Sequence, residues 1–438
     1  MIKFRQCIFP VGQGGFSMGF LTKTDHNNID RILYNYVYDC GSIDLSELDR
    51  ELAQVEELLM KDNLLINTVF ISHLDADHIN GFDKLCKIIN GNIKNIILPY
   101  IDSKEQLYLI AVALSENKLS ESYFQFITDT NKWIKDRAPK AKIFKLRAKK
   151  NIEQPFPSFE DNSFRSEDSD VIVQPEDSKV IVQIEGFEKK LNEENQETTY
   201  SHIAQKLVSS DFKEPLLFLL TYVPFQTNDE LSSFGKCLKK SYPNFDINEL
   251  KNILKNSKSR RALKECYSSL SRDHNAISMN LLVKTLKATR LISELPYLDR
   301  FYIDDCHIIL DCYHCYHRYH LYHFEKIKYN ASFLFTGDAK LSVKKYYNQW
   351  VKFLDNYLRD ITFCTLPHHG SELSFNKDMV KKLPNAFFIA QASTHNKYKH
   401  PSESVIEFIT KEERRYFHHV NQYNTSRIDL TYKLYTRK

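Results

Sequence analysis

The chain of 438 residues is 42% hydrophobic and 26% charged, which is typical of folded globular proteins and excludes a disordered or fibrous chain. It exceeds the roughly 250–300 residues at which single cores usually stop growing, so we expect one large domain with insertions or two domains. No run of 18 apolar residues predicts a transmembrane helix, and the first 16 residues lack the apolar core of a signal peptide. Nine irregularly spaced cysteines argue against a disulfide framework, so we expect a cytoplasmic protein with reduced thiols.

Charge is distributed unevenly along the chain. Residues 151–200 hold 13 Asp and Glu against 4 Lys and Arg, a net charge of −9. Because the whole chain carries +4, the rest of it carries +13. Such a surplus suits a polyanionic partner such as nucleic acid, and it fits equally a protein that is simply rich in lysine.

The first 150 residues alternate between predicted strands and predicted helices. Strands are predicted over residues 5–22 (two strands joined by a glycine turn), 31–42, 67–72 and 93–100, and helices over 45–63 and 81–90. This alternation predicts a layered α/β architecture. We therefore assign residues 1–150 to the first half of a catalytic core.

The remainder of the chain reads as core strands separated by insertions. Its predicted segments are an acidic insertion with one hairpin over 151–210, core strands with a basic helical insertion over 211–284, a second insertion over 285–330, and the second half of the core over 331–438. Within these segments, strands are predicted over 215–225, 274–284, 331–339, 363–371, 386–393 and 428–435. The basic helical stretch is read as a solvated helix face in preference to a nucleic-acid contact.

Four side chains of the kinds that bind metals gather in the stretch SHLDADHIN: His73, Asp75, Asp77 and His78. Such groups are costly to bury without a partner, so the stretch is exposed or something neutralises it. It follows a predicted strand, at the carboxyl edge where open α/β layers bind ligands. The spacing lets His73 and Asp75 face one cation and Asp77 and His78 a second, a pair that clamps an attacking water and a leaving oxygen.

Further ligand candidates follow later apolar runs. Asp338 closes FLFTGDA, His368 and His369 follow FCTLP, and His400 precedes Pro401 after FFIAQAS. Because each lies just beyond a predicted strand, the strands would aim these side chains into one site. The alternative is that the segments are ordinary turns, and four matches in this order favour the site.

These motifs resemble those of the metallo-β-lactamase fold, through SHLDADHING, FLFTGDA, LPHHGS and KHPS. More narrowly, they are similar to the soluble hydrolase domain of ComEC-type DNA-uptake proteins and their stand-alone relatives. FPVGQGGFSMGF matches the opening segment of that subgroup, and VYDCGS matches its strand ending in Asp-Cys-Gly or Asp-Thr-Gly. The match covers residues 1–100 and 331–438 well, 215–284 loosely and the insertions not at all, and it is more specific to fold than to substrate.

The resemblance implies an α/β fold, a four-layer αββα sandwich, with two divalent metal ions, Zn²⁺ or Mn²⁺, at one edge of the paired sheets. The metal shell that it implies comprises His73, Asp75, Asp77, His78, Asp338, His368 and His400. Asp338 would bridge the ions, and Asp39 would orient ligands through hydrogen bonds. His368 or His369 would be a ligand or contact the leaving side of the substrate.

Three further roles are expected from the same resemblance. Asp77 and His369 would assist proton transfer, and Ser371 would contact substrate. The general family has His where this chain has Asp75, and the exchange of nitrogen for oxygen favours Mn²⁺ or Mg²⁺ relative to Zn²⁺. The family also often carries a His before the bridging Asp. His274 is the candidate here, against the interpretation that a His at a strand start is structural.

A second cluster lies in DCYHCYHRYHLYHF, residues 311–324, where four His recur at intervals of three with two Cys and four Tyr among them. Cys-x-x-Cys is compatible with zinc, but a zinc site usually needs a second pair at a distance. Three interpretations stay open: an aromatic insertion packed on the core, a structural metal site, and a surface that contacts substrate or partner.

The leading prediction is a metal-dependent hydrolase, a phosphodiesterase or nuclease that uses a two-metal-activated water on a nucleic acid or nucleotide. One alternative is a hydrolase subunit of a bacterial multi-protein system, including antiviral ones, that is gated by a protein partner bound through the insertions. Another is an amide, thioester or lactone hydrolase, because fold does not fix function. No membrane association is expected.

Overall fold

The computed structural model describes most of the chain, and the structural statements below concern only that part. The described residues are 1–60, 64–115, 120–147, 170–174, 180–187, 189–192, 197–209, 215–225, 278–287, 289–292 and 331–435, with single positions at 236, 237, 240, 256, 258, 261, 265, 266 and 329. His274, the 311–324 cluster and nearly all of the basic stretch over 228–270 lie outside the described residues.

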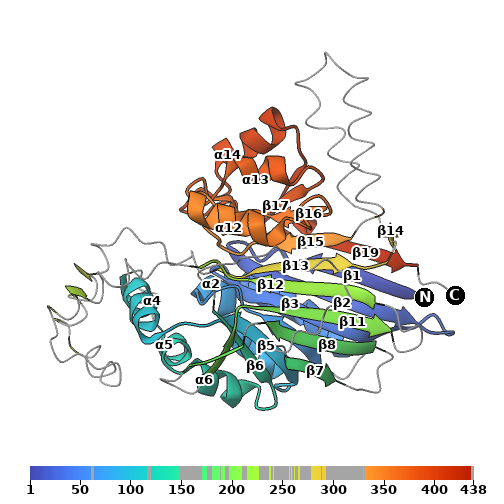
Figure 1. Cartoon of the computed structure of the whole chain (residues 1–438), viewed down its shortest axis with the longest axis horizontal. Coiled ribbons are helices and arrows are strands. Elements are labelled where there is room, and N and C mark those ends of the chain that lie inside the picture. Colours follow the sequence, from blue (N-terminus) through green and yellow to red (C-terminus); the bar gives the residue numbers. More distant parts are fainter. Residues whose placement is uncertain are drawn as a thin grey trace.

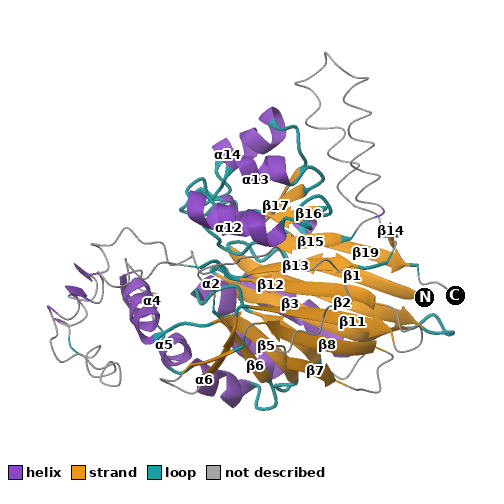
Figure 2. Ribbon diagram, in the orientation of Figure 1, coloured by secondary structure: helices purple, strands orange, loops and turns teal. Residues whose placement is uncertain are grey.

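The described strands form two large sheets that lie face to face (Figures 1 and 2). In spatial order, the ten-stranded sheet is β14 (Thr289–Leu291), β19 (Ile428–Leu434), β1 (Ile2–Ile8), β2 (Gly14–Thr24), β3 (Asp30–Ser42), β4 (Ile66–Phe70), β5 (Ile93–Pro99), β6 (Lys142–Leu146), β10 (Glu197–Tyr200) and β9 (Lys190–Asn192). The nine-stranded sheet is β18 (Phe417–Val420), β17 (Phe387–Gln391), β16 (Phe363–Thr365), β15 (Ser332–Phe335), β13 (Asn280–Thr285), β12 (Pro215–Tyr222), β11 (His202–Ser209), β8 (Val180–Phe187) and β7 (Asp170–Gln174).

Helices cover the outer face of each sheet. Along the first half of the chain they are α1 (Leu45–Leu59), α2 (Ala76–Ile79), α3 (Phe82–Ile88), α4 (Ser103–Ser115), α5 (Glu121–Thr128) and α6 (Thr130–Arg137). Along the second half they are α12 (Lys344–Leu354), η5 (Pro367–Gly370), α13 (Lys377–Lys382), α14 (Glu403–Glu407), η6 (Phe408–Glu412) and η7 (Asn424–Ser426). Figure 1 shows α12, α13 and α14 beyond the nine-stranded sheet and α4, α5 and α6 beside β5 and β6.

Three apolar clusters fill the spaces between the four layers. The first joins the ten-stranded sheet to α1 and its neighbours, where Leu48, Leu52 and Val55 recur on one helix face. The second, with Phe70 and Phe333, lies between the sheets. The third packs α12 and α13 on the nine-stranded sheet. The predicted four-layer αββα sandwich is therefore confirmed.

Both sheets place parallel strands next to the predicted ligand segments. β3, β4 and β5 run parallel in one sheet, and β15, β16 and β17 run parallel in the other. Parallel neighbours end at the same edge of a sheet, so the loops that follow them gather there. Figure 1 shows α2, which follows β4, at the end of the molecule away from the two chain termini.

Two expectations are wrong. The stretch over 151–210 was expected to hold one hairpin, but it contributes β7, β8 and β11 to one sheet and β9 and β10 to the other. Short, interrupted apolar runs concealed these strands. The thiols were all expected to be reduced, but Cys237 and Cys266 form a disulfide, while Cys7, Cys40, Cys86 and Cys364 are free and buried. Among the described helices, none is both long and apolar enough to cross a membrane.

Candidate metal centre

Loops at one edge of the two sheets bring the predicted ligands together. His73 follows β4, and Asp77 and His78 lie in α2 directly after it. Asp338 follows β15, and His369 lies in η5 after β16. The ten-stranded sheet thus supplies the first three side chains and the nine-stranded sheet the other two, so the site lies between the sheets.

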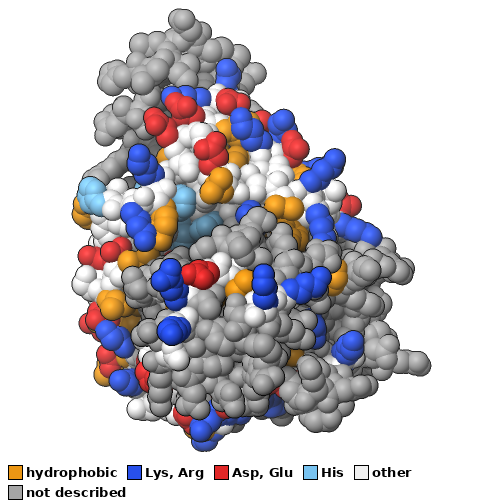
Figure 3. Space-filling view, turned by 90° about the vertical axis from the view of Figure 1, so that its left-hand side faces the viewer, with side chains coloured by type: hydrophobic (Ala, Val, Ile, Leu, Met, Phe, Trp, Pro, Cys, Tyr) orange, Lys and Arg blue, Asp and Glu red, His pale blue; other side chains and the backbone are white. Residues whose placement is uncertain are grey.

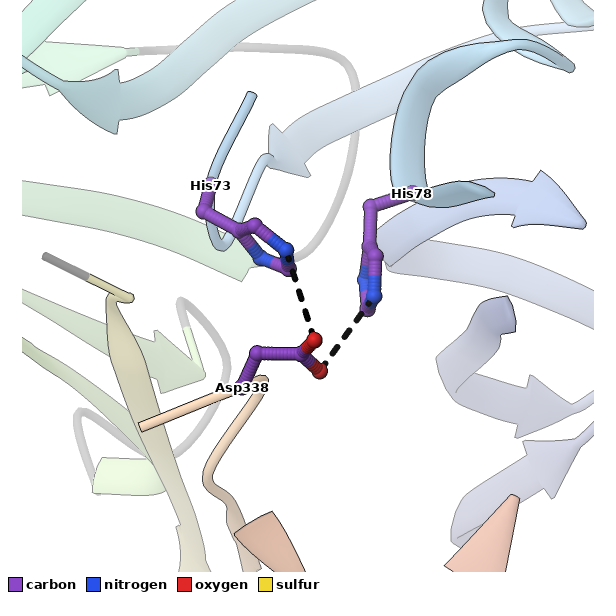
Figure 4. Close-up of side chains that lie close together, drawn as sticks. All are labelled: His73, His78 and Asp338. Atoms are coloured by element: carbon purple, nitrogen blue, oxygen red, sulfur yellow. Dashed lines mark ion pairs between the residues drawn. The ribbon is translucent and has the colours of Figure 1, made fainter. Parts of the chain in front are cut away.

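His73, His78 and Asp338 form the first group of candidate ligands (Figure 4). His73 Nε2 lies 3.7 Å from Asp338 Oδ2, and His78 Nε2 lies 3.4 Å from Asp338 Oδ1. One ligand atom from each residue lies within 4.8 Å of the others. Asp75, the N-cap residue of α2, faces the same group, because its Oδ2 is 3.8 Å from His73 Nε2.

Asp77, His78 and His369 form the second group, whose ligand atoms also lie within 4.8 Å of one another. His369 Nε2 lies 3.7 Å from Asp77 Oδ2 and 3.6 Å from Asp338 Oδ1. His78 belongs to both groups. Asp338 faces both as well, as a bridging carboxylate would, because its Oδ2 lies near His73 and its Oδ1 lies near His78 and His369. His369 was predicted to assist proton transfer, with a ligand role as an alternative, and its Nε2 belongs to the second group of candidate ligand atoms.

His368 and His400 lie further out than these residues. His368 Nε2 is 3.6 Å from Asp338 Oδ2, and its side chain is 28% exposed. The His400 ring lies 5.5 Å from the His368 ring and belongs to neither group of ligand atoms. Burial, helped by the two neighbouring histidines, lowers the pKa of His400 to about 4. His400 was predicted to be a ligand, and the structure brings it beside the site rather than into it.

Asp39 and Ser72 hold the two histidines of the first group by hydrogen bonds. Asp39 Oδ1 accepts the Ser72 N–H at 2.7 Å, and Asp39 Oδ2 accepts the Ser72 hydroxyl at 2.7 Å. His78 Nδ1 lies 2.9 Å from Asp39 Oδ2, and His73 Nδ1 lies 2.9 Å from Ser72 Oγ. Because a carboxylate only accepts and the hydroxyl already donates, both Nδ1 atoms carry the proton, which leaves both Nε2 lone pairs for a ligand.

The backbone around Asp338 and His369 adopts conformations that most residues avoid. Gly337 has φ +51°, and a Cβ there would lie 2.3 Å from Ser278 Oγ, so only glycine fits. His368 and His369 have φ of 49° and 57°. His369 Nδ1 donates to the Gln391 carbonyl at 2.7 Å, which again leaves Nε2 for a ligand. Strained backbone of this kind concentrates at functional sites.

The electrostatic balance of the site depends on Asp338. Burial opposes its charge, but four surrounding imidazoles outweigh burial and hold the pKa of Asp338 well below its usual value. Burial likewise opposes charge on His78, but Asp338 and Asp39 outweigh it and raise its pKa well above the ordinary value. A metal ion at His78 Nε2 would therefore take the place of the second ring proton. For His73, burial and the neighbouring His78 lower the pKa by more than the nearby carboxylates raise it.

The donor atoms of this site fit divalent metal ions. His73 Nε2, His78 Nε2 and His369 Nε2 are buried and have no hydrogen-bond partner. Buried polar atoms almost always have one, so three converging exceptions indicate a missing partner with positive charge. Nitrogen and carboxylate oxygen atoms in two groups that share His78 and both face Asp338 are the donor set of a two-metal site.

Sequence reasoning missed several supporting residues. Ser72 is part of SHLDADHIN, and only the structure brings its hydroxyl between Asp39 and His73. Ser278, whose Oγ accepts the Asp338 N–H at 2.9 Å, had no signal in the sequence. Ser371 is buried, and its N–H donates to the His368 carbonyl at 2.8 Å, so it supports the turn while substrate contact stays a prediction.

Comparisons with known proteins give distant structural matches. No protein-family model and no curated protein matches the sequence. A long form RNase Z from yeast is 10% identical with a TM-score of 0.31, and the match covers 89% of this chain and 37% of the yeast chain. The metallo-β-lactamase fold protein YhfI from Bacillus subtilis is 13% identical with a TM-score of 0.19, and the match covers 48% of this chain and 58% of YhfI. The short form of human tRNase Z is 15% identical with a TM-score of 0.19, and the match covers 47% of this chain and 65% of the human chain.

The chain thus spans less than two thirds of each of these three structures. Likenesses with such low TM-scores carry no argument about activity. The functional proposal below therefore depends on the geometry of this chain.

Proposed function

We propose that this protein is a metal-dependent hydrolase that uses two divalent cations to activate water. The observation that carries the proposal is the convergence of three buried, unpartnered imidazole Nε2 atoms on the carboxylate of Asp338. A structural role alone would leave such atoms hydrogen-bonded. The layered αββα fold with this site at the sheet edge agrees with the resemblance of the motifs to metallo-β-lactamase-fold hydrolases.

His73, Asp75 and Asp338 are proposed to hold one cation, with His368 at its open side. Asp77, His78, His369 and Asp338 are proposed to hold the other. Such a pair supplies an activated water and stabilises charge on the attacking and leaving oxygens. Since Asp75 brings a hard oxygen donor, we propose Mn²⁺ as a metal at least as suitable as Zn²⁺.

Other side chains of the protein are proposed to orient the ligands and to accept a proton. Asp39 and Ser72 keep the Nδ1 protons in place and thereby fix the two imidazole rings. The Asp77 carboxylate, 3.7 Å from His369 Nε2, is the proposed acceptor for the proton that water loses. His400, whose ring lies 5.5 Å from that of His368, is proposed to contact the leaving group.

A phosphodiester is the proposed substrate bond. The charge surplus outside the acidic stretch and the similarity of FPVGQGGF and VYDCGS to the ComEC-type subgroup support a nucleic acid or nucleotide. A partner-gated form of the same enzyme and an amide, thioester or lactone hydrolase are the alternatives that the experiment must separate.

The test combines metal content with hydrolysis. The purified protein is analysed for Mn²⁺ and Zn²⁺ and then assayed on single-stranded DNA, RNA, bis-p-nitrophenyl phosphate and a thioester. The control is the double variant Asp77→Ala with His78→Ala. About two metals per chain and phosphodiester cleavage lost in the double variant support the proposal. Two metals with only thioester cleavage redirect it to another bond, and a protein that binds no added metal refutes it.

A further inference from the structure

The loop after β17 presents an exposed aromatic ring between two lysines at the rim of the site. Residues 392–402 read ASTHNKYKHPS and contain no acidic side chain. Tyr398 is 41% exposed, and Lys397 and Lys399 on either side of it are exposed too. Figure 3 shows histidine side chains set back in a hollow of this face, with lysine and arginine side chains around it.

A series of rings connects Tyr398 to the metal centre. The Tyr398 ring lies 5.9 Å from the His400 ring, with an angle of only 16° between the planes. The His400 ring lies 5.5 Å from that of His368, whose Nε2 is 3.6 Å from Asp338. A strand whose phosphate reached the metal centre would therefore pass the exposed ring within a short distance.

The loop holds Tyr398 in a fixed position. Asn396 Nδ2 donates to the Ser393 carbonyl at 2.6 Å, and Asn396 Oδ1 accepts the His400 N–H at 2.9 Å, so one side chain ties both ends of the loop tip. The Lys399 N–H donates to the Asn396 carbonyl at 3.2 Å, with Lys399 in the left-handed region at φ 56°. Because these bonds fix the backbone on both sides of Tyr398, a ligand that stacks on its ring has only the side chain left to order.

We propose that Tyr398, with Lys397 and Lys399, forms a subsite that stacks an unpaired base of single-stranded nucleic acid beside the metal centre. The Lys397 ammonium lies over the face of the Tyr398 ring, 4.7 Å from its centroid. A base that stacks on this face displaces the ammonium, which is then free to bind the phosphate next to that base. Aromatic rings that take bases and lysines that follow the backbone are the two elements of single-strand binding surfaces. The subsite rests on the proposed function and specifies its substrate as a strand with unpaired bases.

The chain offers a matched control at the other end of the sheets. Tyr435, just beyond β19, is 45% exposed, and the Lys433 ammonium lies 5.3 Å from its ring centroid. β19 pairs along its whole length with β1, and Leu434 is opposite Ile2, far along the strands from the site. Figure 1 shows the C-terminus and α2 at opposite ends of the molecule.

The test measures binding by fluorescence anisotropy of a labelled oligothymidylate on the full-length protein, in Mn²⁺ and separately in EDTA. We expect Tyr398→Ala to weaken binding about 5- to 150-fold, the range for one stacked base, and Tyr398→Trp to retain it. Tyr435→Ala should bind as the unmodified protein does. Lys397→Ala and Lys399→Ala should each reduce the slope of log affinity against log salt by about 0.7.

Two results would overturn the proposal. One is a Tyr398→Ala variant that binds the oligonucleotide as tightly as the unmodified protein. The other is a duplex or an acidic peptide that competes as well as the single strand, because a general polyanion surface has no use for the ring. Failure of the proposed function is recognised separately, as absence of bis-p-nitrophenyl phosphate cleavage with both metals, since the EDTA measurement needs no catalysis. Thermal unfolding of each variant verifies that it is folded.

Discussion

The two halves of the metal centre are constructed in different ways. The half from the ten-stranded sheet is one short stretch, His73 to His78, fixed by side-chain hydrogen bonds from Asp39 and Ser72. The half from the nine-stranded sheet comes from separate strand ends and is fixed by backbone conformation, with positive φ at Gly337, His368 and His369. One site can therefore be held in place both by side-chain hydrogen bonds and by backbone conformation, and a different kind of substitution disrupts each half.

Asp338 faces histidines of both groups of candidate ligands, so its loss should have the largest effect. Asp338→Asn keeps the shape and removes the charge that faces four imidazoles. We expect hydrolysis to fall at least about 1,000-fold, because several kcal/mol of transition-state stabilisation depend on bound cations. Metal content by atomic emission should fall with it. A variant that retains two metals and normal turnover would contradict the bridging role.

Gly337→Ala tests the half that depends on backbone conformation. The new Cβ would lie 2.3 Å from Ser278 Oγ at a φ of +51°, so we expect a loss of about 3 kcal/mol in the free energy of unfolding, measured in urea. Metal affinity of the folded fraction should fall too. Gly91→Ala, also at positive φ but before β5 at the other end of the sheet, should cost stability and leave metal affinity unchanged. Equal metal affinity in Gly337→Ala and Gly91→Ala would contradict the idea that the backbone conformation at Gly337 positions the ligands.

Ser72→Ala tests the half that depends on side chains. Removing the hydroxyl between Asp39 and His73 should weaken metal binding about 10- to 100-fold, as loss of an orienting partner does. The matched variant is Ser374→Ala, whose hydroxyl lies 3.2 Å from Nδ1 of the more exposed His368. Its effect on metal affinity, measured by competition with a chelator, should be smaller. The reverse order would mean that the nine-stranded half controls binding.

The smallest effect expected concerns pH and a histidine of β18. Burial lowers the pKa of His418 by more than the Ser426 carbonyl, which lies 2.8 Å from its Nε2, raises it. Below about pH 6.5 the unfolded chain gains a proton there that the folded chain does not, so stability should fall as the pH falls, by at most about 1.4 kcal/mol per pH unit from this group. His418→Gln should flatten that slope in urea titrations between pH 5 and 7. An unchanged slope would show that other groups set it.

The half of the candidate site that comes from the ten-stranded sheet was easier to predict from the sequence than the half from the nine-stranded sheet. Four candidate ligands in six positions after an apolar strand are visible without a structure, and the later candidates Asp338 and His369 were found by the same rule of strand ends. Which of His368, His369 and His400 faces the candidate metal site depends on left-handed turns that composition does not reveal. Ser72 and Ser278 act through tertiary contacts, and serine is too common to stand out.

The fold followed from periodicity where strands were long and apolar, as with β5 and β12. The prediction failed in the acidic stretch, because short strands of mixed composition show little hydrophobic periodicity and depend on partner strands far away in the chain. β11, for example, pairs with β12 on one side and β8 on the other.

That acidic stretch has a consequence for the solution behaviour of the protein. Its strands β7 and β9 are the outermost strands of the nine-stranded and the ten-stranded sheet. An outermost strand offers unpaired N–H and C=O groups to any other chain, which is how sheets aggregate. The sequence that contains β7 and β9 carries a net charge of −9, so the same sequence in a second copy would repel it. Charge of one sign in the sequence around an outermost strand is a means by which proteins avoid edge-to-edge pairing.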